Sequence, residues 1–101
     1  MENKFELHQK ILSDMHELYR RKNTDYGDST HDTYLKFGAA AYLVRMYDKL
    51  NRLHTLTQND VDINVPSETI HDTLMDLANY AILMSMELRM ESCKGVKSSY
   101  D

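Results

Sequence analysis

Residues 74–86 read LMDLANYAILMSM and decide the fold, because apolar side chains occur on nearly every side of this segment when it is drawn as a helix. Pro66 suits the first turn of a helix and Gly95 suits the stop after its last turn, so a helix is predicted over 67–93. A helix that is apolar all round is buried. Since the rest of a 101-residue chain is too small to enclose it, we expect a homo-oligomer in which a second subunit covers part of this helix.

Two more helices are predicted on the N-terminal side of this segment, over 2–22 and 32–57, where apolar residues recur at helical spacing. The stretch KNTDYGDSTHD at 22–32 is rich in Asn, Asp, Gly, Ser and Thr and is predicted to be a loop. A second connection is predicted over 57–67, with a short extended piece at VDINV. Gly38 lies inside the helix over 32–57, where it indicates a kink or the close approach of another helix. The predicted fold is a single all-α domain over 1–101 with three long helices.

The composition is that of an ordinary globular domain, with 42% apolar and 28% charged residues. The single cysteine, Cys93, excludes an internal disulfide and a cysteine-based zinc site. No apolar run is long enough for a signal core or a membrane span, so a cytoplasmic location without membrane partners is expected. The net charge of −4 argues against nucleic acid as a partner, because phosphate contacts need a basic surface. A small phosphorylated ligand needs only a local group of cations and stays open.

Two polar stripes are predicted on inward faces of the last two helices. On the helix over 67–93, four side chains fall in one narrow arc that apolar residues continue: Glu68, Asp72, Asp76 and Asn79. On the helix over 32–57, three cations and one acid also share an arc: Arg45, Asp48, Lys49 and Arg52. Because buried carboxylates need a cation, a metal or good hydrogen-bond donors, the two stripes are expected to face each other.

The paired stripes have two interpretations. They form either a salt-bridge network that only fixes helix packing, or a site for an anionic ligand or for a divalent metal with a phosphate. Carboxylates on successive turns offer the oxygen ligands that Mg²⁺ prefers, and Arg and Lys suit phosphate oxygens. The ligand interpretation is preferred, because the stripes hold more charge than packing needs. The loop at 22–32 adds residues that either surround a ligand or simply close a turn: Lys22, Asn23, Tyr26, Gly27 and Asp28.

Several separated motifs, in this order, resemble those of a known family. They are KNTDYGDS at 22–29, Phe37–Gly38, RMYDKLNRL at 45–53 and ETIHDTLMDLANYAIL at 68–83. Over about residues 10–85 the chain resembles the phage and bacterial nucleotide modification associated domain type one family. That family is distantly similar to the MazG-like all-α NTP pyrophosphohydrolases and the dimeric dUTPases. The resemblance implies a helical, usually oligomeric protein with a nucleotide-related role, in the cytoplasm of a host cell if it is phage-encoded.

The sequence departs from the pyrophosphohydrolase pattern at the metal site. Those enzymes hold Mg²⁺ with an ExxE pair on one helix and an ExxD pair on a later one. Here Arg45 and Asp48 stand where the first pair would be, and the later helix has acids at spacing four. A guanidinium cannot ligate a metal, so the departure weakens the case for hydrolysis and favours holding a phosphate.

Three hypotheses follow for function. The first is an Mg²⁺-dependent pyrophosphohydrolase that converts an NTP or dNTP to the monophosphate, with Asp72 and Glu68 as catalytic residues and a metal set of Asp48, Glu68, Asp72 and Asp76. In it, a metal-bound water attacks the phosphate, and the nucleotide is contacted by Lys22, Asn23, Tyr26, Gly27, Asp28, Arg45, Lys49, Arg52 and Asn79. The second is a non-catalytic phage protein that sequesters a nucleotide, including a cyclic signal of host defence. The third is a helical protein whose stripes only set the register between subunits.

Overall fold

The computed structural model describes residues 3–26, 28–58 and 67–93, and within these ranges it contains four α-helices and no strand. The helices are α1 (Lys4–Tyr26), α2 (Ser29–Phe37), α3 (Ala40–Gln58) and α4 (Ser67–Cys93). The all-α prediction is confirmed, and α4 has the predicted bounds. The residues 59–66, with the predicted extended piece and Pro66, and Gly95 lie outside the described part of the chain.

The predicted loop over 22–32 is wrong for most of its length, because α1 continues to Tyr26 and α2 begins at Ser29. The short polar side chains that suggested a loop are accommodated within the helices. The Thr24 hydroxyl donates to the backbone carbonyl of Arg20 at 2.9 Å, and just after the stretch the Thr33 hydroxyl donates to that of Ser29 at 2.9 Å. These bonds to the preceding turn give each hydroxyl a partner within its helix.

The helix predicted over 32–57 is in fact two helices, and Gly38 separates them. Its φ of 69° and ψ of −153° belong to a region that is essentially restricted to glycine. The Gly38 amide still donates to the Tyr34 carbonyl at 2.7 Å, which closes α2, and the Ala41 amide bonds to the Gly38 carbonyl at 3.0 Å as α3 begins. The residue expected to kink one long helix therefore ends a short helix and redirects the chain.

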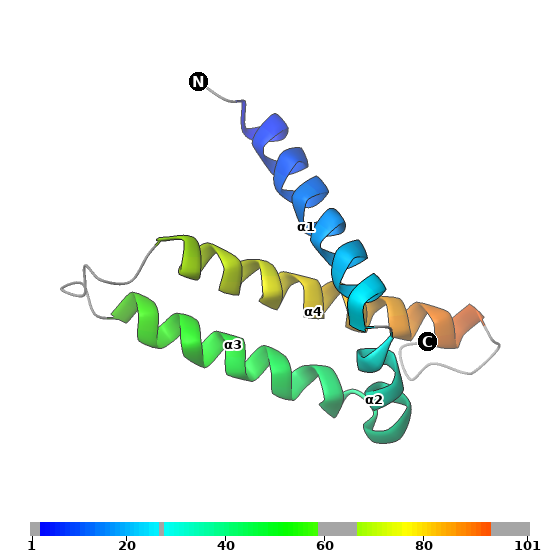
Figure 1. Ribbon diagram of the computed structural model, residues 1–101. Helices are drawn as coiled ribbons and strands as arrows, with labels where there is room; N and C mark the ends of the chain where they lie inside the picture. The colour runs from blue at the N-terminus through cyan, green and yellow to red at the C-terminus, as the bar shows by residue number, and fades with distance from the viewer. Residues whose placement is uncertain (1–2, 27, 59–66, 94–101) are drawn as a thin grey trace.

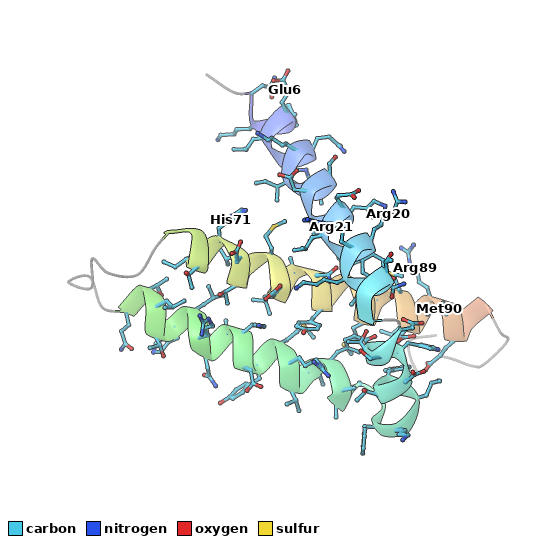
Figure 2. All side chains as sticks on the ribbon, viewed as in Figure 1. Glu6, Arg20, Arg21, His71, Arg89 and Met90 are labelled. Atoms are coloured by element: carbon cyan, nitrogen blue, oxygen red, sulfur yellow. The ribbon has the colours of Figure 1, made fainter. Side chains whose placement is uncertain are left out.

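The helices are arranged around an antiparallel pair, α3 and α4, that run side by side (Figure 1). The short α2 packs at the end of this pair where α3 begins. The longer α1 crosses α4 with its C-terminal part and projects away with its N-terminal part, where Glu6 is labelled in Figure 2. Within the described ranges, the buried apolar residues are Met15, Tyr34, Tyr42, Leu53 and Met75. The packing between helices thus depends largely on α4, which contacts α1, α2 and α3.

A single chain does not cover the last helix on all sides, as expected from its sequence. Large apolar side chains on α4 remain exposed: Leu74, Ile82, Met86 and Met90. A second exposed apolar stripe follows α3: Leu43, Val44, Tyr47 and Leu50. Among the described residues, no helix is long and apolar enough to cross a membrane.

Candidate functional site

Asp76 joins three helices through two ion pairs. Its Oδ1 atom lies 3.3 Å from Nζ of Lys22 on α1, and its Oδ2 atom lies 3.2 Å from Nζ of Lys49 on α3. All three side chains keep contact with water, with the Asp76 side chain 26% exposed. An acidic residue of α4 therefore pairs with a cation of α3, as the facing stripes predict. Lys22 of α1, from the stretch that was predicted to be a loop, adds a second cation.

A hollow of about 330 Å³ opens beside this ion-pair group, and we call it the first hollow. Five of its lining residues are candidates that the sequence supplied: Lys22, Asn23, Arg45, Asp76 and Asn79. Five more were missed by sequence reasoning: Tyr19, Ser29, Thr30, Tyr80 and Leu83. The missed residues come from α1, α2 and α4, and only the crossing of these helices brings them together, so helical spacing within one element gave no signal for them.

A second hollow, of about 380 Å³, shares Arg45 and Tyr80 with the first. Its other lining residues are Asp48, Lys49 and Arg52, so the predicted stripe of α3 lines it almost completely. The Arg45 guanidinium carbon lies 5.8 Å from the centroid of the Tyr80 ring. This cation–π contact holds the guanidinium between the two hollows.

The charge around the two hollows is predominantly positive. They are lined by two carboxylates, Asp48 and Asp76, and by four cationic side chains: Lys22, Arg45, Lys49 and Arg52. The first hollow also offers two amide side chains, Asn23 and Asn79, and two tyrosine rings. Together these groups suit an anionic molecule that also carries a planar, hydrogen-bonding part.

The predicted metal ligands do not gather in the same way. Asp72 is exposed and lines neither hollow, while both oxygens of Asp76 face lysines. Among the described residues, no three His, Cys, Asp or Glu side chains are placed to hold a metal ion. The side chains of Glu68 and Tyr26, and all of Gly27, lie outside the described part, and Asp28 is exposed just before α2.

A buried cluster lies further along α4, and sequence reasoning missed it. Glu87 is almost completely buried and accepts hydrogen bonds from the Tyr42 hydroxyl at 2.8 Å and from Nδ1 of His31 at 2.7 Å to Oε1. One turn later, Glu91 accepts a hydrogen bond from the Tyr34 hydroxyl. Tyr34 and Tyr42 also stack at a tilt, with ring centroids 5.8 Å apart. We call these five residues the buried cluster.

The buried cluster has a clear electrostatic effect on Tyr42. Burial raises the pKa of the Tyr42 hydroxyl far above its usual value of 10, and the hydrogen bond to the Glu87 carboxylate raises it further, because both disfavour a second negative charge there. The one signal in the sequence was an acid inside the apolar run LMSMELRM. Its partners lie on two other helices, so spacing on α4 could not reveal them.

Comparison with known proteins identifies one family. A family profile described as nucleotide modification associated domain 1 matches residues 22–88, which is more than half of the chain. The matched segment contains nine of the ten residues that line the first hollow, together with all five that line the second. No curated protein and no solved structure matches the chain.

Proposed function

The chain belongs to the nucleotide modification associated domain 1 family, and on that premise we propose that its two hollows bind a nucleotide or a nucleotide-derived phosphate ligand. The observation that carries the proposal is the arrangement of cations from α1 and α3 around adjoining hollows, one of which also contains aromatic and amide side chains. A ligand with an anionic end and a planar end would contact both hollows.

The second hollow suits the phosphate end of such a ligand. Arg45 and Arg52 present planar guanidinium groups that can bind two oxygens of one phosphate at once, and Lys49 adds a point charge. The first hollow suits the nucleoside end. Asn23 and Asn79 each carry both donors and an acceptor for a base edge or a sugar hydroxyl, and the tyrosine rings offer apolar faces.

The described residues favour binding over metal-dependent hydrolysis. An Mg²⁺ site of the expected kind needs several carboxylate or water oxygens. Here Asp76 is paired with Lys22 and Lys49, and Asp72 lies away from the hollows. We therefore propose a nucleotide-binding protein, in line with the sequestering hypothesis, and assign no catalytic step to Asp72.

Calorimetric titration with nucleoside mono-, di- and triphosphates and cyclic nucleotides, with and without Mg²⁺, tests the proposal. Arg45→Ala is expected to lower the affinity for the most tightly bound nucleotide by about tenfold, which equals about 1.4 kcal/mol of binding free energy. Arg20→Ala removes an equal charge from an exposed position of α1 outside both hollows and is expected to change nothing. Absence of binding by every nucleotide, or equal losses in the two variants, would refute the proposed site. Release of a monophosphate that Asp76→Asn abolishes would show an enzyme instead.

We also propose that a second copy of the chain covers α4. Exposed residues without charge fall in an arc of about 100° on its outer face: Leu74, Ala78, Ala81, Ile82 and Ser85. Figure 2 places His71 and Arg89, which precede and follow these residues along the helix, on the side of α4 away from α3. The small residues in the middle allow another helix to approach closely.

Sedimentation is expected to show an oligomer that Ala81→Glu dissociates and that Tyr47→Glu, on the α3 stripe, leaves intact. A monomeric wild type, or the opposite response of the two variants, would refute this interface.

A further inference from the structure

Asp48 is the one carboxylate among the described residues that line the second hollow. It follows Arg45 by three residues and precedes Arg52 by four, so it lies on the same side of α3 as these two cations. Asp76 faces two lysines, whereas Asp48 is exposed and forms no ion pair with any other described residue. Its negative charge is therefore not neutralised locally and acts on any anion that enters the second hollow.

The two hollows together have only a small excess of positive charge. Their four cationic side chains and two carboxylates leave a net charge of +2 among the described lining residues. A phosphate monoester carries close to two negative charges at neutral pH, because its second pKa is about 6. A nucleoside monophosphate therefore balances the charge of the site. The additional phosphate groups of a di- or triphosphate bring more negative charge than these cations offset.

We propose that the site binds a nucleoside monophosphate in preference to a metal-free di- or triphosphate, and that Asp48 sets this preference. This inference rests on the proposed function and names its ligand class. One phosphate bound by the guanidinium groups of Arg45 and Arg52 uses the cations of the second hollow. A longer phosphate chain places its further charges in the same space as Asp48. Repulsion by an unpaired charge is one way in which a binding site rejects the wrong ligand.

This repulsion acts over a short range. The second hollow has a volume of about 380 Å³, so charges inside it are separated by distances comparable with the Debye length of about 8 Å at physiological salt. Salt at that concentration therefore screens the repulsion only in part, and high salt screens it almost completely. The preference for the monophosphate is expected to be largest at low salt and to shrink as salt is added.

Asp48→Asn and Asp72→Asn form a matched pair of variants for the test. Each replaces an exposed aspartate by a neutral side chain of the same shape, but Asp72 lines neither hollow. The 5′-mono-, di- and triphosphates of the four common ribonucleosides are titrated, without metal, into the wild type and both variants. For the best-bound nucleoside, the wild type is expected to bind the monophosphate about tenfold more tightly than the triphosphate.

The variants are expected to differ in this ratio of affinities. Asp48→Asn is expected to reduce it by about fivefold, mainly by strengthening triphosphate binding, because a neutral amide no longer repels the additional charges. Asp72→Asn is expected to change it by less than about twofold, because screening weakens the effect of a more distant charge. Equal changes in the two variants, or an unchanged ratio in Asp48→Asn, would overturn the role of Asp48.

Repeating the titrations with Mg²⁺ tests the opposite role for the same carboxylate. If Asp48 repels phosphate, Asp48→Asn does not lower triphosphate affinity in Mg²⁺. A loss of triphosphate affinity that occurs in Asp48→Asn only when Mg²⁺ is present would show that Asp48 holds a metal and would overturn the inference.

The same experiment separates failure of this inference from failure of the proposed function. If the wild type binds a triphosphate more tightly than the monophosphate without metal, the inference is wrong but the nucleotide site stands. If no nucleotide of any phosphate length binds the wild type, the proposed function is wrong and the ligand class is wrong with it.

Discussion

Asp76 and Glu87 are two carboxylates of α4, about three turns apart, that meet very different surroundings. The Asp76 side chain is 26% exposed and faces two lysines, whereas the Glu87 side chain is 4% exposed and faces a histidine and a tyrosine. Lysines at an exposed site are flexible and can turn to another anion. The Tyr42 hydroxyl, which is held in the core, cannot. The comparison shows that one helix can carry both a replaceable and a permanent set of polar contacts.

The difference in burial also decides how much each carboxylate contributes to stability. An exposed ion pair contributes between about 0 and 1 kcal/mol, because water screens it and side-chain entropy opposes it. Removing one member of a buried polar group leaves its partners unsatisfied and costs several times more. The Glu87 region is therefore expected to dominate stability, and the Asp76 region is expected to dominate ligand binding.

The largest expected effect comes from Glu87→Ala. It leaves the buried Tyr42 hydroxyl without its acceptor and removes the carboxylate that the half-buried His31 ring faces, and the free energy of unfolding is expected to fall by about 3 kcal/mol. Urea unfolding followed by circular dichroism measures the change. Asp76→Ala is the control, with an expected loss of no more than about 1 kcal/mol. Equal losses at the two positions would remove the distinction between the regions.

These two regions were not equally predictable from the sequence. The charge stripes of α3 and α4 follow helical spacing within one element, so the sequence predicts Arg45, Lys49, Arg52, Asp76 and Asn79, and these residues do line the hollows. The buried cluster combines single residues from three helices. Whether such residues meet is decided by how the helices cross, and a single sequence does not contain that information directly.

The helix boundaries show the same limit. The all-α class and the bounds of α4 followed from apolar spacing, which is strong over a long helix. The break at Gly38 was expected only as a kink or a close approach, because a glycine inside an apolar pattern does not reveal its dihedral angles. That break separates α2 from α3, and α2 contributes Ser29 and Thr30 to the first hollow. Because the sequence does not predict the break, it does not predict this wall of the hollow either.

An intermediate effect is expected from alkaline pH. The pKa of Tyr42 is raised in the folded protein, mainly by burial, whereas in the unfolded chain it titrates near 10. Above about pH 10 the unfolded state therefore binds fewer protons than the folded state, and this contribution to stability falls by up to about 1.4 kcal/mol per pH unit. Below pH 10 it is fully present.

Denaturant unfolding at pH 9, 10 and 11 measures this slope. Tyr42→Phe is expected to lose stability less steeply with pH than the wild type. Tyr47→Phe, which changes an exposed tyrosine on the same helix, is expected to retain the wild-type slope. If Tyr42→Phe keeps that slope as well, then the core does not hold the Tyr42 hydroxyl neutral. The proposed difference between the contacts of Glu87 and those of Asp76 would then lack electrostatic support.

The smallest expected effect on stability, and the sharpest on mechanism, comes from Asp76→Asn. The amide keeps the shape of the side chain and removes the charge that Lys22 and Lys49 face, so the free energy of unfolding is expected to change by less than about 1 kcal/mol. In the absence of metal, both ammonium groups become available, and the affinity for inorganic pyrophosphate is expected to rise.

The sign of that change in pyrophosphate affinity is the informative result. In a site that binds anions through cations alone, Asp76 competes with phosphate for the two lysines, so its neutralisation strengthens binding. In a site that binds phosphate through a metal held by Asp76, its neutralisation weakens binding in the presence of Mg²⁺ and changes little without it. Calorimetry of the variant with and without Mg²⁺ therefore distinguishes a binding protein from a metal-dependent enzyme with one substitution. Lys49→Ala, which removes a cation from the same ion-pair group, is expected to shift the affinity in the opposite direction if the first description is correct.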